Sequence, residues 1–223
     1  MTVLLGIPTH GSSVAWRTAL AVGMCTEHEL QVSYLQMSLL PHVFNLLWVA
    51  AVKQPDITHF AMLHADIGVQ DGLWLDKMIA ELERTDALIL SANVRMKDAT
   101  GKYSTAWDNG KARPDLKLEK LHRDDLEALP TTFNVNDVRE RHPEAERLLL
   151  NTGCWVAKLD GDWIKKVCFR LKTHVTWDGN VPTCDVDSED WELSRDMASW
   201  GFGERIYATS IVTTEHVGSS LFV

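Results

Sequence analysis

Strand and helix signals alternate through about the first ninety residues, and this alternation constrains the fold more strongly than any other feature of the 223-residue chain. Residues 3–7 form a short apolar run that ends at Pro8, which is typical of a buried strand. Further runs of strand character follow at 30–35, 58–65 and 87–90, and apolar residues recur at helical spacing within 14–22, 43–52 and 74–82. This order predicts a largely parallel sheet covered by helices.

Regular patterns are fewer in the second half of the chain. They return at 148–150 and 154–157, and the acidic stretch at 187–190 opens a helix that runs to about Trp200. Residues 205–214 are typical of one or two short strands that lead to His216. Near the amino terminus, Ser12 or Ser13 is placed to cap the first helix. We expect one α/β domain over residues 1–223, Rossmann-like, with a mixed but mostly parallel sheet flanked by helices.

A charged segment interrupts this pattern at about residues 95–147. It holds 11 of the 22 basic residues beside 11 acidic ones and shows little periodicity. Such a segment is typical of an exposed, partly helical insertion, and the alternative is a mobile segment that meets the substrate. Because acids lie among its basic residues, a solvated face is favoured over a basic strip. The basic residues in question are Lys97, Lys102, Lys111, Arg113, Lys117 and Lys120.

The net charge of −9 argues against a protein that coats nucleic acid by bulk electrostatics, although a metal ion could hold phosphate groups locally. The sequence opens without the basic and apolar regions of a signal peptide, and its four cysteines are scattered, so we expect a cytoplasmic protein. Residues 30–52 carry no charge, but polar residues interrupt them, and we expect no membrane span. Nine tryptophans suit either ring-binding platforms or core packing.

Three places are candidates for binding, because ligands of open α/β sheets lie at the carboxyl ends of the parallel strands. They are the loop from Pro8 to Gly11, the strand end His64-Ala65-Asp66, and the region of His216. A carboxylate held after an apolar strand, together with a later imidazole, suits Mn²⁺ or Mg²⁺ that bridges diphosphate oxygens. The alternatives are a solvated loop aspartate at 66 and a structural histidine at 216.

The acidic stretch from Asp187 to Glu192 allows two interpretations. Acidic side chains in a first helical turn stabilise the helix dipole by about 0.3–1 kcal/mol each, without any catalytic role. In the other interpretation, one carboxylate is a general base aimed into a cleft, with Trp191 beside the substrate. The spacing alone favours neither interpretation.

Together these segments resemble those of nucleotide-sugar glycosyltransferases of the A-type fold, in particular small phage and bacterial proteins of the family-two-like group. The resemblance covers about residues 3–94 and 148–218. Each motif is weak alone, and their order and spacing make the match moderately specific. The segments are 7–11 (IPTHG), 60–67 (FAMLHADI), and 151–156 (NTGCWV) followed by 188–190 (SED) and 215–218 (EHVG).

The resemblance implies a metal-dependent enzyme that moves a sugar from a nucleotide-diphosphate sugar, such as a UDP-sugar, to an acceptor hydroxyl with inversion. In this assignment Asp190 is the catalytic base and Glu189 supports it, while Asp66 and His216 bind Mn²⁺ or Mg²⁺. Nucleotide binding would fall to Pro8, Thr9, His10, Asn45, His64 and Asp66, and sugar or acceptor binding to Gly153 and Trp191. The acceptor would be a modified DNA base or a glycan, and a phage-encoded protein would act in the host cytoplasm.

One residue departs from the family's Asp-x-Asp metal motif, since His64 replaces the first aspartate. The stereochemical outcome stays open, because the Asn-Thr-Gly segment and a late histidine also occur in retaining relatives. A nucleotidyltransferase that makes nucleotide sugars is one alternative, which a first loop without a basic residue before Arg17 disfavours. A degenerate module that only binds a nucleotide sugar is the other, and the substitution at His64 keeps it open.

Overall fold

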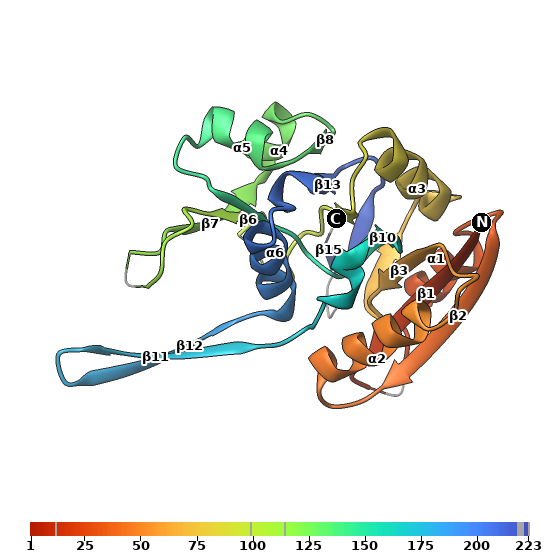
Figure 1. Ribbon diagram of the computed structural model, residues 1–223, viewed down its shortest axis with the longest axis horizontal. Helices are drawn as coiled ribbons and strands as arrows, with labels where there is room; N and C mark the ends of the chain where they lie inside the picture. Colours follow the sequence, from red (N-terminus) through yellow and green to blue (C-terminus); the bar gives the residue numbers. More distant parts are fainter. Residues whose placement is uncertain (12, 99, 114, 218–220, 223) are drawn as a thin grey trace.

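The computed structural model describes residues 1–223 with the exception of 12, 99, 114, 218–220 and 223. Its centre is one sheet formed by β1 (Thr2–Thr9), β2 (Glu29–Gln36), β3 (His59–Leu63), β5 (Ile89–Ala92), β8 (Thr132–Phe133), β10 (Cys154–Lys158) and β13 (Ile206–Thr209). The strand order is β2-β1-β3-β10-β5-β13-β8 (Figure 1). The expectation of an α/β fold with a mixed sheet is confirmed.

Half of the strand pairings in this sheet are antiparallel, so the expectation of a mostly parallel sheet is wrong. β1 pairs in parallel with β2 and β3, and β5 pairs in parallel with β13. β10 runs antiparallel to both β3 and β5, and β8 runs antiparallel to β13. Periodicity could not reveal this, because β10 enters the centre of the sheet after a long connection that leaves its direction open.

Helices cover both faces of the sheet. Buried side chains of α1 and α3 belong to one core cluster, and those of α2 and α6 belong to another. Along β1, Leu4 belongs to the cluster of α2 and α6, whereas Val3 and Leu5 belong to the cluster of α1 and α3. The strand is therefore buried over its whole length. The helices are α1 (Trp16–Gly23), α2 (Leu40–Val52), α3 (Trp74–Arg84) and α6 (Glu189–Ser199).

The first helix begins later than its sequence predicts. Its N-cap is Ala15, without a side-chain hydrogen bond, so Ser13 is not the cap, and Ser12 lies outside the described residues. The helix start is held instead by the Ala65 carbonyl, which accepts from the Ala15 N–H at 2.8 Å and from the Thr18 hydroxyl at 3.1 Å. This contact ties α1 to the loop that follows β3.

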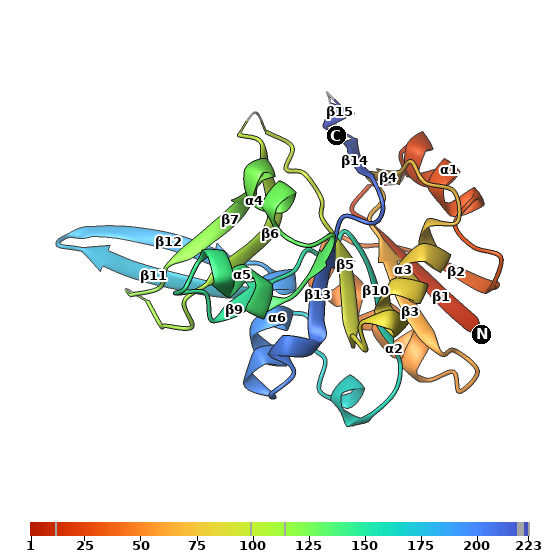
Figure 2. The same cartoon turned by 90° about the horizontal axis from the view of Figure 1, so that it is seen from above.

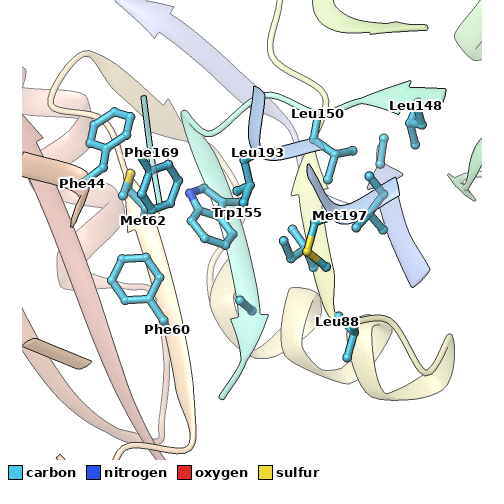
Figure 3. Packing of buried hydrophobic residues seen from close by; sticks show 14 of the residues in the cluster. Phe44, Phe60, Met62, Leu88, Leu148, Leu150, Trp155, Phe169, Leu193 and Met197 are labelled. Carbon is cyan, nitrogen blue, oxygen red and sulfur yellow. The ribbon is translucent and has the colours of Figure 1, made fainter. Parts of the chain in front are cut away.

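Most of the tryptophans fill the core. Trp48 stacks on Trp155 with ring centroids 6.1 Å apart, and Phe60, Trp163 and Phe169 pack around them. Figure 3 shows Phe60 and Phe169 beside Trp155. The side chains that are 3% exposed or less are Trp48, Trp74, Trp107, Trp155 and Trp163. For these five residues, core packing is therefore the correct interpretation.

The charged segment at 95–147 contains more regular structure than its composition predicts. Two short helices fit the expectation of a partly helical insertion, but a three-stranded sheet in the order β7-β6-β9 was not foreseen. Trp107 and Leu148 of this sheet join the core cluster of α2 and α6. The elements of the segment besides β8 are β6 (Lys102–Asp108), β7 (Leu118–His122), α4 (Arg123–Ala128), α5 (Val135–Arg141) and β9 (Arg147–Leu149).

Two smaller sheets complete the fold. β4 (Ile67–Val69) pairs with β14 (Thr214–Val217), which also pairs with β15 (Leu221–Phe222). The hairpin of β11 (Lys172–Asp178) and β12 (Val181–Asp187) projects from the body (Figures 1 and 2). The 3₁₀ turns are η1 (Asp162–Lys165) and η2 (Gly203–Arg205). Among the described residues, no helix combines the length and apolarity needed to span a membrane.

Candidate active site at the edge of the sheet

The strand ends that the sequence singles out meet at one edge of the central sheet. His64 follows β3 and Gly153 precedes the antiparallel β10, and the His64 N–H donates to the Gly153 carbonyl at 2.8 Å. β14 reaches the same edge, because His216 pairs with Ile67 and the Val217 N–H donates to the Asp66 carbonyl at 2.7 Å. The fold therefore brings His64, Asp66, Gly153 and His216 together; Gly218, behind His216, lies outside the described residues.

The Asp66 carboxylate is the centre of this group. Its Oδ2 lies 3.6 Å from Nε2 of His216, and the same oxygen forms an ion pair with the Lys97 ammonium. Burial raises the pKa of Asp66, but the hydrogen bonds from His216 and Lys97 and the Lys97 charge outweigh burial and hold this pKa well below its usual range. Asp66 is therefore ionised at any physiological pH.

The hydrogen bond of the second ring nitrogen of His216 determines which nitrogen faces Asp66. Nδ1 lies 3.0 Å from the carbonyl oxygen of Arg95. A carbonyl can only accept a hydrogen bond, so Nδ1 carries a proton, and Nε2 is the nitrogen left to face Asp66. This is the arrangement in which a histidine most often serves as a metal ligand.

His64 lies in a more apolar environment than its neighbours. Its ring packs against Phe44 with centroids 5.2 Å apart, and among the described residues its buried Nε2 has no hydrogen-bond partner. Burial lowers the pKa of His64 to about 4, although the charge of Asp66 opposes this shift. The imidazole is therefore neutral near pH 7, with a polar atom that a bound ligand could satisfy.

Gly153 occupies a position with no room for a side chain. A Cβ at this position would lie 2.4 Å from Cδ1 of Ile67 and 2.6 Å from Oδ1 of Asn151. The Asn151 amide oxygen also accepts from the Gly153 N–H at 2.7 Å. The space beside Gly153, which the resemblance assigned to sugar or acceptor binding, is thus occupied by groups of the protein itself.

The two carboxylates predicted to take part in catalysis, Glu189 and Asp190, lie at the start of α6. Burial raises the pKa of Asp190, against hydrogen bonds from the Ser188 hydroxyl and from the backbone of Trp191 and Thr152. Burial, followed by the charge of Asp190, raises the pKa of Glu189 to about 7. Both shifts arise first from burial, which distinguishes these two groups from exposed acids that only complement a helix dipole. Thr152 adjoins Gly153 and thereby links this pair to His64.

The remaining predicted site residues occupy varied environments. Asn45 has a structural role. Its side-chain amide donates to the Phe169 carbonyl at 2.8 Å and accepts from the Phe169 N–H at 2.9 Å. Pro8 and Thr9 are buried at the end of β1, and His10 is exposed just beyond it. The Trp191 indole donates to the Ser104 carbonyl at 3.3 Å and so faces the charged segment.

Sequence reasoning missed Lys97. Lys97 belongs to the charged segment, whose composition favoured a solvated face, yet its ammonium forms an ion pair with Asp66. The signal that could have located it is its position shortly after the strand β5, whose end lies near those of β1 and β3. Ser188 and Thr152 lie in the segments 188–190 and 151–156 that the sequence singled out, but no role at Asp190 was predicted for either of them.

Two side chains described at this edge of the sheet could together bind a divalent cation. Asp66 and His216 are in contact, but within the described part of the chain no cluster of three or more His, Cys, Asp or Glu side chains is placed to hold a metal ion. Further ligands of a bound ion would have to come from water or from the substrate.

Comparisons with known proteins identify a similar fold. No family profile matches the sequence, and no curated protein sequence matches it. Among solved structures, the crystal structure of A197 from STIV is similar, with a TM-score of 0.59 and 14% sequence identity over 100% of this chain and 94% of that chain. At this identity the likeness concerns the fold alone.

Proposed function

We propose that the protein is a glycosyltransferase of the A-type fold that moves a sugar from a nucleotide-diphosphate sugar to an acceptor hydroxyl. The observation that carries this proposal is the contact of Asp66 and His216 at the edge where open α/β sheets bind their ligands. The buried pair of Glu189 and Asp190 supports it, because raised pKa values of buried carboxylates are typical of acid–base catalysts.

The donor set fits a divalent cation such as Mn²⁺ or Mg²⁺ in chemical type. Asp66 offers an ionised oxygen, and His216 offers Nε2 while Nδ1 donates to the Arg95 carbonyl. The Lys97 side chain must move away before the cation binds, because its ammonium forms an ion pair with Oδ2 of Asp66. When bound, the ion would stabilise negative charge on the departing diphosphate as a Lewis acid.

Asp190 is the base in this proposal. Hydrogen bonds from the Ser188 hydroxyl and the Trp191 N–H fix the orientation of its carboxylate, which would accept the proton of the acceptor hydroxyl. Glu189 supports it through charge, and its own pKa of about 7 makes it the competing candidate for the base. General-base catalysis of this kind contributes roughly 10²–10⁴-fold to rate.

A module that binds a nucleotide sugar without turnover is the second candidate function. The ion pair of Lys97 with Asp66 favours it, because an ammonium held there could replace the metal ion beside a diphosphate. Nucleotidyl transfer is less well supported. Arg17, the first basic residue of the chain, is committed to Glu215 at 2.6 Å and is not available for a triphosphate.

The test is product analysis with a panel of nucleotide sugars and Mn²⁺. Release of nucleoside diphosphate supports glycosyl transfer, and release of pyrophosphate from a sugar phosphate and a nucleoside triphosphate indicates nucleotidyl transfer. Asp66→Asn should abolish turnover. Asp71→Asn is the matched control, since Asp71 also pairs with a lysine, at 2.9 Å, but lies at the other end of the β4–β14 ladder. Donor binding without turnover under all conditions would leave the binding module as the function.

A further inference from the structure

A second group of charged residues lies where α6, β9, the base of the β11–β12 hairpin and the turn after β6 meet. These elements enclose a cavity of about 430 Å³. Its lining includes five cationic side chains and, among the described residues, a single carboxylate, that of Asp187. The cationic side chains are Lys111, Arg113, Arg147, Lys172 and Arg195.

Buried acids form ion pairs with the guanidinium groups of this cavity and fix their orientation. Asp108 is fully buried and accepts from Nε of Arg147 at 2.6 Å and from Nε of Arg195 at 3.0 Å. Asp187 is 3% exposed and contacts Arg195 at 3.0 Å and Arg113 at 3.4 Å. The arginines are thereby oriented before any ligand arrives, which reduces the entropy lost on binding.

Several donors at the cavity are not used by the protein. Nε of Arg147 bonds to Asp108, but within the described residues its two terminal nitrogens have no hydrogen-bond partner. Lys111 and Lys172 likewise form no ion pair with any described residue. The acids that pair with the arginines include Asp108, which is fully buried, Asp187, which lines the cavity, and Asp185, which accepts from Arg113 at 3.1 Å. Among the described residues, five cationic side chains line the cavity against the one carboxylate of Asp187, although the whole protein carries −9.

We propose that this cavity binds the phosphate group of a small anionic ligand, of the size of a nucleotide or a sugar phosphate. A planar guanidinium with two free nitrogens binds phosphate oxygens in a bidentate manner, and flanking lysines add point charges. The volume exceeds that of a single phosphate and lies within the usual range of small-ligand pockets. The proposal does not depend on sugar transfer, since it uses none of the residues at Asp66 or Asp190.

The experiment measures binding of inorganic pyrophosphate by isothermal titration with the full chain. EDTA is present throughout, so that no divalent ion can recruit pyrophosphate to Asp66. The key variant is Lys111→Glu with Lys172→Glu, because neither lysine supports a buried acid and the fold should persist. Lys53→Glu at the end of α2 is the control, an exposed lysine with the same change of charge.

We expect millimolar or tighter binding by the wild type and a loss of about tenfold or more in the double variant. Lys53→Glu and Asp66→Asn should both bind as the wild type does. The proposal is overturned if the folded wild type does not bind millimolar pyrophosphate, or if the double variant binds equally well. It is also overturned if Lys53→Glu weakens binding as much, which would indicate a general effect of charge. Tighter binding of a short oligonucleotide through the same lysines would replace the small ligand by nucleic acid.

Discussion

The imidazole of His216 faces the carboxylate of Asp66, with 3.6 Å between Nε2 and Oδ2, although the two residues are 150 positions apart in the sequence. With Nδ1 donating to the Arg95 carbonyl, Nε2 donates to Asp66 only when the ring is doubly protonated, and a neutral ring turns its lone pair toward the carboxylate. Beside a neutral ring, the ionised carboxylate therefore depends on a cation. Lys97 supplies it in this structure, and a divalent ion is the natural competitor.

Lys97→Met should therefore increase the affinity for Mn²⁺. The ammonium is about one-third exposed, so the pair with Asp66 contributes about 1 kcal/mol at most, and the gain should be about two- to fivefold. Titration of Mn²⁺ followed by thermal unfolding measures the effect. Lys102→Met in the same segment is the control and should leave the affinity unchanged. A weaker affinity after Lys97→Met would mean that Lys97 supports the site rather than competing for it.

Much of the fold could be predicted from the sequence because its signals are local. The strands β1, β2, β3 and β5 and the helices between them follow directly from the period of their apolar residues. The direction of β10 could not be predicted, since it depends on pairing with distant segments. The hairpin of β11 and β12 pairs neighbouring segments, but it is exposed on both strands, which removes the apolar period that would reveal it.

The candidate site was predicted only in part for a related reason. Asp66 and His216 each follow a recognisable strand, and the rule that strand ends bind ligands brings them to one edge. Lys97 belongs to the charged segment at 95–147, whose composition does not indicate where its side chains lie. Asn45 was expected at the nucleotide, yet its amide bonds Phe169, which lies far along the chain and which no local pattern links to α2.

His64 should make the protein less stable in mild acid. Its pKa is about 4 when folded and near 6.5 when unfolded, so between these pH values the unfolded chain binds a proton that the folded chain does not. Stability contributed by the neutral imidazole is therefore lost as the pH falls from 6.5 to 4, by a few kcal/mol at most. Urea unfolding of His64→Gln and the wild type at pH 7 and pH 4.5 measures this. The stability difference between them should shift in favour of the variant at pH 4.5, and an unchanged difference would contradict the burial argument.

Glu189 should have the opposite dependence on pH. Its pKa is raised to about 7 in the folded protein, so the folded state retains a proton that the unfolded chain loses above pH 4.5. The stability associated with protonation is present below pH 4.5 and is lost as the pH rises through 7. Glu189→Gln should accordingly be more stable than the wild type at pH 8 and about equal to it at pH 4.5. Equal unfolding free energies at pH 8 would show that the carboxylate is better solvated than its position indicates.

Gly153→Ala should destabilise the protein through packing. The added Cβ would lie 2.4 Å from Cδ1 of Ile67, and neither the ladder of β4 nor the Asn151 bond leaves room for a shift. We expect a loss of about 1–3 kcal/mol in the free energy of unfolding. Gly23→Ala at the end of α1 is the control, because nothing lies within 4 Å of its added Cβ. Equal stability of the two variants would mean that the turn at 151–153 adapts easily.

Asp190→Asn distinguishes the two candidate bases. The charge of Asp190 helps to raise the pKa of Glu189, so its removal should bring that pKa below 7, which NMR titration of ¹³C-labelled glutamate can measure. If Asp190 is the base, transfer is lost while the donor still binds, because the hydrogen bonds to its carboxylate from the Ser188 hydroxyl and the Trp191 N–H involve none of the residues assigned to the nucleotide. If Glu189 is the base, transfer persists and the rising limb of its pH–rate profile moves to lower pH together with the measured pKa. Full activity with an unshifted profile would exclude both carboxylates from the reaction and leave the start of α6 with a structural role.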